Sequence, residues 1–134
     1  MALLQLSVFA ENKPGHLLQI TEILGKAGVD IRAMSVADTK DFGILRMIVN
    51  DPSAARAALA EKCLVSVSEV LAIAIPDTPG SLMNVVRLLS DNNINIEYTY
   101  AFFKSADSAA YIVLQVDDHA RAEELLNGAG IKMV

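Results

Sequence analysis

The stretch Asn12-Lys13-Pro14-Gly15-His16-Leu17 returns, with the same order of residue types, as Asp77-Thr78-Pro79-Gly80-Ser81-Leu82. An offset of 65 residues aligns the two glycines, and at this offset the apolar residues that follow also coincide. The aligned pairs are Leu17 with Leu82, Ile20 with Val85, Leu24 with Leu89, Val29 with Ile94 and Ile31 with Ile96. A repeat of this length predicts two copies of one structural unit, which we place at residues 1–68 and 69–134.

The repeat continues to the end of the chain at a slightly larger offset. Asp51 aligns with Asp118 and Leu59 aligns with Leu126, both at a separation of 67 residues. The second copy has therefore gained two residues, which we place in a loop around Ser105 to Ser108.

Composition predicts a soluble protein with an aliphatic core. Hydrophobic residues make up 53% of the 134 residues, aromatic residues 5% and charged residues 20%. The formal net charge is −5 and no two basic residues are adjacent, which argues against a nucleic-acid partner. Each half is of a size that folds only marginally by itself, so each gains from burying a face against a neighbour.

Cysteine usage and the start of the sequence predict a cytoplasmic location. Cys63 is the single cysteine, so we expect a buried structural thiol and no disulfide, metal or cofactor. The apolar start MALLQLSVFA lacks a basic region before it and a small-residue cleavage pattern after it, which argues against a signal peptide. No apolar stretch approaches the roughly 18 residues that span a bilayer, so no membrane association is expected.

Hydrophobic periodicity predicts the same series of elements in both copies. Alternating apolar residues indicate strands, and apolar residues three or four apart indicate helices. In the first copy we expect a strand at 3–9, a helix at 16–27, strands at 29–36 and 44–49 joined by a turn near 38–43, a helix at 54–62 and a strand at 64–67. In the second copy we expect strands at 71–75, 94–103, 109–116 and 131–134, with helices at 81–90 and 119–126.

This order predicts an α+β fold of two ferredoxin-like βαββαβ units, in which helices pack on antiparallel sheets. Gly28 is expected to end the first helix, because glycine adopts a left-handed conformation at little cost. No Gly- or Ser-rich linker separates the copies. The last strand of the first copy should therefore run almost directly into the first strand of the second.

Both copies resemble the ACT domain. The resemblance rests on the two Pro-Gly stretches, each preceded by a strand, and on Ala27-Gly28-Val29-Asp30-Ile31 and Asn93-Ile94-Asn95-Ile96 after the helices. It covers essentially the entire chain and leaves no room for a catalytic domain. ACT domains are regulatory modules that bind free amino acids, usually between two domains. The resemblance implies a tandem amino-acid sensor without catalytic activity.

The loops themselves favour the same function. The first backbone N–H groups of a helix are unpaired and favour a negative group, so they can hold a carboxylate. Glycine lets a ligand approach the backbone, while the ammonium group needs acceptors such as Asn12 or Asp77, helped by Asp30 or Asn95 of the opposite domain. The candidate ligand-binding residues are Asn12, Lys13, Gly15, His16, Leu17 and Asp30 in the first copy, and Asp77, Thr78, Gly80, Ser81, Leu82 and Asn95 in the second.

Each candidate also has a purely structural explanation. A Pro-Gly pair after a strand is most often only a turn, and Asn12 or Asp77 can simply cap a helix. Asp30 and Asn95 lie where any strand could begin. The duplication and the resemblance together favour ligand binding in at least one copy, and differences between the copies allow one pocket to be vacant.

The residue pattern gives no positive support for catalysis. His16 and His119 have no partner in the repeat, and nothing in the sequence links them to a nucleophile. Asp51, Asp117 and Asp118 are expected to cap helices. Two alternatives remain open: a regulatory subunit that docks on an amino-acid biosynthetic enzyme, and a small isomerase-type enzyme. We also expect a homodimer, because a second chain commonly covers open sheet edges and helix faces.

Overall fold

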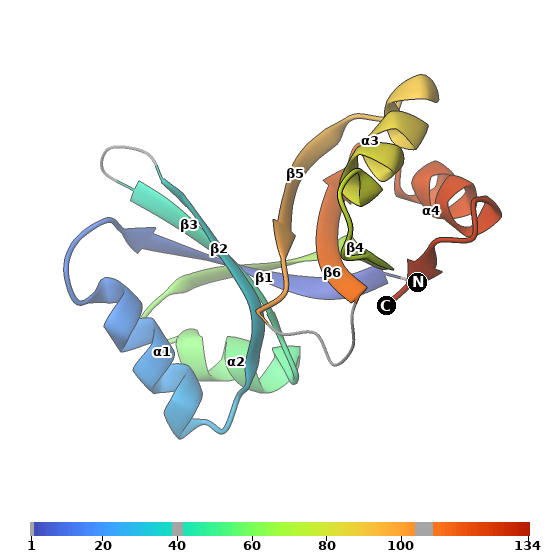
Figure 1. The fold of residues 1–134 in the computed structure, drawn as a ribbon. Coiled ribbons are helices and arrows are strands. Elements are labelled where there is room, and N and C mark those ends of the chain that lie inside the picture. Colours follow the sequence, from blue (N-terminus) through green and yellow to red (C-terminus); the bar gives the residue numbers. More distant parts are fainter. Residues whose placement is uncertain (1, 39–41, 104–108) are drawn as a thin grey trace. The chain divides into compact units, whose positions relative to one another are not determined.

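The computed structural model describes residues 2–38, 42–103 and 109–134 (Figure 1). The predicted insertion at Ser105 to Ser108 and the middle of the predicted turn near 38–43 lie outside the described residues. In chain order the elements are β1 (Ala2–Glu11), α1 (His16–Lys26), β2 (Ile31–Asp38), β3 (Phe42–Val49), α2 (Pro52–Leu59), β4 (Leu64–Pro76), α3 (Ser81–Asp91), β5 (Ile96–Ala101), β6 (Ala109–Val116), α4 (His119–Gly128) and β7 (Lys132–Met133).

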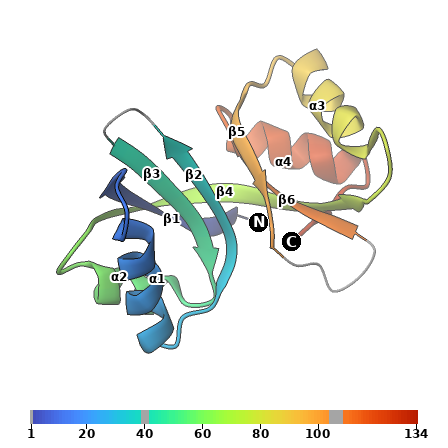
Figure 2. The ribbon, with the colours of Figure 1, turned by 60° about the vertical axis from the view of Figure 1, so that its left-hand side comes forward.

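The chain divides into two compact units, and both have the predicted ferredoxin-like order of strands. One unit is Leu4–Glu69, with the strand order β2-β3-β1-β4. The other is Val70–Val134 with Met1–Leu3, with the order β5-β6-β4-β7. In each unit both helices lie on one face of the strands (Figures 1 and 2). The α+β prediction is confirmed.

Strand β4 joins the two units without interruption. It runs for 13 residues, and the division between the units falls inside it, after Glu69. The predicted strands 64–67 and 71–75 are therefore parts of one strand. This direct continuation is what the missing linker predicted.

Each unit has its own aliphatic core, built from equivalent positions of the repeat. In the first unit, Ile20 and Leu24 of α1 and Leu59 of α2 pack against the strands. In the second unit the equivalent residues Val85, Leu89 and Leu126 do the same. The strand residues that receive them are Leu6, Val8, Leu45, Met47 and Val49 in the first core, and Leu71, Ile73, Ile75, Leu114 and Val116 in the second.

Some element boundaries differ from those that the periodicity predicts. Helix α2 ends at Leu59 instead of residue 62, and the N–H groups of Lys62 and Cys63 both donate to the Leu59 carbonyl (3.1 and 2.9 Å) where the chain leaves the helix. Strand β5 begins at Ile96 instead of residue 94, because the Ile94 N–H donates to the Leu89 carbonyl (2.9 Å) and closes the end of α3.

A left-handed residue follows three of the helices. Gly28 after α1 has φ 72°, as predicted, and Gly130 after α4 has φ 77°. Asn93 takes this conformation after α3, with φ 60°. Asparagine tolerates positive φ better than most residues, which explains how it replaces glycine there.

Aspartates cap the second helix of each unit. The Asp51 side chain accepts a hydrogen bond from the Ala54 N–H, and Asp118 accepts one from the Arg121 N–H, both at 3.1 Å. Both caps were predicted. The predicted capping role of Asp117 is wrong, because its carboxylate accepts from the Asn95 N–H instead (3.0 Å).

The caps give a first prediction. Replacing Asp51 with Ala should lower the free energy of unfolding by about 1 kcal/mol, because the Ala54 N–H loses its acceptor. Asp118→Ala should cost a similar amount. Ser53→Ala, an exposed change in the same turn as Ala54, serves as the control and should stay within about 0.5 kcal/mol. Urea unfolding measures all three, and an equal loss in the control would contradict the assigned caps.

Candidate functional site

The two Pro-Gly loops form the same turn in both copies. Gly15 and Gly80 are the residues before α1 and α3, with φ of 90° and 87°, and neither helix start has a side-chain cap. The His16 N–H donates to the Lys13 carbonyl (3.4 Å), and the equivalent bond in the second copy measures 3.2 Å. Glycine is required here by the backbone conformation itself. Each Pro-Gly pair thus forms a turn, which leaves the following amides of each first helical turn without an intrahelical acceptor.

A hollow of about 130 Å³ lies beside the first of these loops, inside the unit Leu4–Glu69. It is bounded by the end of β1, the first turns of α1, and the adjoining ends of β2 and β3. The lining residues of the candidate site are Ala10, Glu11, Asn12, Lys13, His16, Leu17, Ile20, Val36, Asp38, Gly43 and Leu45. The structure thus brings together four of the predicted site residues: Asn12, Lys13, His16 and Leu17.

Strand register explains why there is room at this place. Ala10 of β1 lies opposite Gly43 of β3, and Asp38 of β2 lies opposite Gly43 from the other side. Opposed residues share a face of the sheet, and Ala10 packs against the core beneath the helices. The row Ala10–Gly43–Asp38 therefore presents one methyl group, no side chain and one short carboxylate toward α1.

The floor of the hollow is apolar. Ile20 and Leu45 are only 2% and 4% exposed, and they come from α1 and β3. Leu17 and Val36 stand at the open side, with 47% and 57% of their surfaces exposed. An apolar group that entered the hollow would be removed from water on several sides, which is favourable.

The rim of the hollow is polar. The Asn12 Nδ2 group donates to Asp38 Oδ2 at 2.7 Å. Lys13 Nζ lies 3.2 Å from Glu11 Oε2, and both of these side chains are largely exposed. Asp38 was not among the predicted site residues. Its position at the end of a strand gave no signal, since only the pairing of β2 with β3 brings it beside the Pro-Gly loop.

The second copy arranges its loop differently. The Thr78 and Ser81 hydroxyl groups bond to each other (2.8 Å), so these two candidates satisfy one another. Ser81 lines a separate hollow together with Ile75, Val85 and Ile131, on the side of α3 that faces α4 and β7. Asp77, Gly80 and Leu82 are exposed and do not line that hollow.

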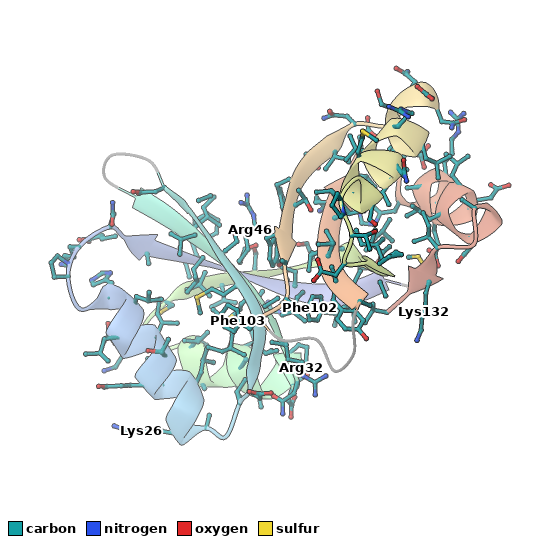
Figure 3. The ribbon with its side chains drawn as sticks, viewed as in Figure 1. Lys26, Arg32, Arg46, Phe102, Phe103 and Lys132 are labelled. Atoms are coloured by element: carbon teal, nitrogen blue, oxygen red, sulfur yellow. The ribbon has the colours of Figure 1, made fainter. Side chains whose placement is uncertain are left out.

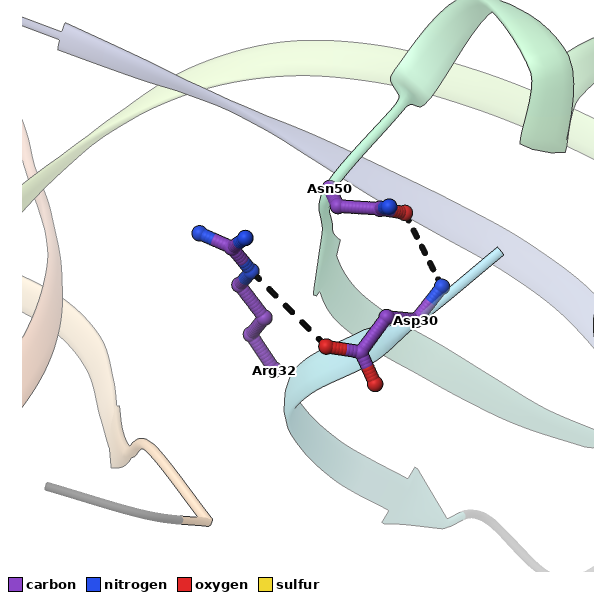
Figure 4. A network of polar contacts seen from close by, with 3 residues as sticks. All are labelled: Asp30, Arg32 and Asn50. Carbon is purple, nitrogen blue, oxygen red and sulfur yellow. Dashed lines mark hydrogen bonds and ion pairs between the residues drawn. The ribbon is translucent and has the colours of Figure 1, made fainter. Parts of the chain in front are cut away.

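Asp30 and Asn95 join strands at the other end of each unit. The Asp30 N–H donates to Asn50 Oδ1 (2.9 Å), the Asn50 N–H donates back to the Asp30 carbonyl (3.1 Å), and Asp30 Oδ2 lies 4.0 Å from Arg32 Nε (Figure 4). The second copy repeats the two hydrogen bonds with Asn95 and Asp117 (3.0 and 3.2 Å).

Within one unit these residues are therefore distant from the Pro-Gly loop. The 11 residues of α1 separate Gly15 from Asp30, and a helix of that length spans about 16 Å. Figure 3 labels Lys26, the last residue of α1, at the end of that helix away from the Pro-Gly loop. The predicted candidates of each copy thus fall into two groups at opposite ends of the first helix.

The side chains of Cys63 and His119 lie outside the hollow beside the first Pro-Gly loop. Cys63 is half-buried, packs against the first core, and has a thiol pKa raised by desolvation. His119 Nε2 lies 2.6 Å from Gln115 Oε1. In the described ranges no three His, Cys, Asp or Glu side chains come together as a metal site, and none of the described helices is long and apolar enough to cross a membrane.

The comparisons with known proteins agree with the repeat and with the fold. A family model described as an ACT domain pair matches residues 1–134. The chain belongs to the ACT domain pair family. Protein BT0572 from Bacteroides thetaiotaomicron is 35% identical, with a TM-score of 0.93 over 100% of this chain and 92% of that one. Among curated proteins none matches.

More distant structures share the fold of the ACT domain pair. The regulatory subunit of aspartate kinase from Thermus thermophilus is 14% identical, with a TM-score of 0.67 over 94% of this chain and 91% of that one. Aspartokinase III from E. coli is 16% identical, with a TM-score of 0.53 over 95% of this chain and 30% of that one. At these identities the likeness concerns the fold alone.

The conformation of Gly15 gives a second prediction. Gly15→Ala should lower the free energy of unfolding by about 1–2 kcal/mol, because φ 90° is strained for a residue with a Cβ. Gly25→Ala, in the last turn of α1 and with open space around its Cβ, should instead raise it by about 0.5 kcal/mol. Thermal and urea unfolding of both variants measure the difference. A change in the free energy of unfolding with the same sign in both variants would contradict the assigned conformation of Gly15.

Proposed function

We propose that this ACT domain pair binds a free amino acid and acts as a regulatory sensor without catalytic activity. The observation that carries the proposal is the hollow beneath the first turn of α1. It combines an apolar floor, the carboxylate of Asp38 and a helix start beside the loop that the repeat singled out.

A zwitterion fits this combination of groups. Its carboxylate would accept hydrogen bonds from the first-turn amides near His16 and Leu17, where the helix dipole favours negative charge. Its ammonium would be held by Asp38, whose carboxylate keeps free acceptor positions after the bond from Asn12. Both charged ends of an amino acid would then have partners of opposite sign at the rim.

Regulation would follow from the two-unit architecture. A ligand that binds one arrangement of the protein better than another shifts the population toward that arrangement. The assistance of Asp30 or Asn95 from the opposite domain, the homodimer and docking on a biosynthetic enzyme all stay predictions. The structural likeness to a protein named as the regulatory subunit of aspartate kinase supports a regulatory role, and it does not identify the ligand or the target.

A thermal-shift screen of the twenty standard amino acids tests the proposal. At a free concentration about 100-fold above its Kd, a specific ligand should add about 2.7 kcal/mol to the stability and raise Tm by several degrees. The corresponding D-amino acid at equal concentration is the control. If none of the twenty shifts Tm, and calorimetric titration finds no heat of binding, the chain is not an amino-acid sensor.

A substitution at Asp38 tests the position of the ammonium group. Asp38→Asn keeps the shape of the side chain and removes its charge, so affinity should fall about 10- to 100-fold, as expected for a hydrogen bond to a charged group. Asp91→Asn, at the exposed end of α3, changes the net charge equally and should leave the Kd unchanged. Isothermal titration calorimetry measures both, and equal Kd values for the two variants would remove Asp38 from the site.

A further inference from the structure

The two copies differ at the positions that give the candidate site its space. In the second copy the strand pairing opposes Ile75 to Ala110, in place of Ala10 opposite Gly43. Isoleucine carries an ethyl and a methyl group that alanine lacks, and Ile75 is only 6% exposed. The positions that leave room in the first unit are thus occupied by larger side chains in the second.

The third member of the row also changes. At the offset of the repeat, Phe103 takes the position of Asp38, so the second copy has an aromatic side chain in place of that carboxylate. Asp77 replaces Asn12 and supplies a negative charge in the loop instead. The second copy therefore keeps a charge in its loop but has less room along this row. Its own hollow, lined by Ser81 and Ile75, lies on the other side of α3 and does not include Asp77.

Charge pairing at the rim bears on which side chain the first copy accepts. Lys13 forms an ion pair with Glu11. Asp38 accepts a hydrogen bond from Asn12 and, in the proposed complex, holds the ammonium group of the ligand. Beyond the rim lie Ile20 and Leu45, which could not pair with a buried charge. A charged ligand side chain in that position would lose its hydration without compensation.

From these differences we infer that each chain binds a single amino acid with an apolar side chain, in the first unit, and that Ala10 and Gly43 determine its size. The inference rests on the proposed function and deepens it. A hollow of about 130 Å³ is comparable with the apolar cavity of about 150 Å³ that accepts benzene in another protein, so an aliphatic side chain fits.

The chain itself supplies the substitutions for a test. Ala10→Ile with Gly43→Ala transfers the residues of the second copy into the first. A Cβ at Gly43 would lie 3.7–3.9 Å from its nearest neighbours, which is ordinary contact, so the strand accepts alanine. The matched control is Ala101→Val, which gives an exposed position of β5 the residue that the first copy has at the equivalent Val36.

Calorimetric titration with L-leucine, L-alanine, L-lysine and L-aspartate gives the readout. We expect one L-leucine per chain and at least tenfold weaker binding of L-lysine and L-aspartate. The double variant should bind L-leucine at least tenfold more weakly, whereas Ala101→Val should bind it unchanged. Gly43→Ala alone is the milder change, and it should lower the ratio of the L-alanine Kd to the L-leucine Kd at least threefold.

The outcomes separate this inference from the proposed function. Three results would overturn the inference and leave amino-acid binding intact. The first is two ligands per chain, and the second is tighter binding of a charged amino acid than of L-leucine. The third is an unchanged Kd for L-leucine in the folded Gly43→Ala variant and in the folded double variant. If none of the twenty amino acids binds the unaltered protein, the proposed function fails and the inference fails with it. Thermal melts establish which variants are folded.

Discussion

The antiparallel pairing of β1 with β3 is the constraint on which the candidate site depends. It sets Ala10 opposite Gly43, and the pairing of β3 with β2 adds Asp38 to the same row. A slip of one residue in either pair would turn the row to the other face of the sheet and away from α1. The buried positions Leu6, Val8, Leu45 and Met47 hold the register, because the same slip would remove them from the core beneath the helices. The core thus fixes the geometry of the candidate site, although core residues form only its floor.

Local patterns in the sequence predicted the parts of the structure that local forces determine. The βαββαβ order and the capping roles of Asp51 and Asp118 were visible, since each depends on residues a few positions apart, and the repeat was visible because it shows these local patterns twice. The Asp38–Asn12 bond joins residues 26 positions apart, and the Asp30–Asn50 bond joins residues 20 positions apart. Such contacts depend on strand pairing, which periodicity does not specify. For the same reason neither the place of Asp38 beside the Pro-Gly loop nor the bond between Asp30 and Asn50 was predicted.

Comparing the copies with each other separates what the fold needs from what one site adds. Both copies keep the left-handed glycine before the first helix, the aspartate cap of the second helix and the bridge at the start of the second strand. These features satisfy backbone groups that would otherwise lack partners in any unit of this shape. The row Ala10–Gly43–Asp38 is not kept, although the pairing of the strands around it is. A change confined to side chains on a retained backbone alters recognition without altering the fold.

The Asn12–Asp38 bond also bears on how tightly such a site can hold its ligand. Both residues are exposed, so their bond contributes little to stability by itself, and it leaves most acceptor positions of the carboxylate open. An incoming ammonium can therefore add to Asp38 without breaking an existing contact, while Asn12 limits the rotation of the carboxylate. Against this gain stands the exposure of the rim, where water and salt weaken each charged contact. In the proposed complex strong ion pairing is thus unavailable, so the burial of an apolar side chain against Ile20 and Leu45 would supply much of the affinity. Discrimination between amino acids would then depend on this apolar floor more than on the charged groups that all amino acids share.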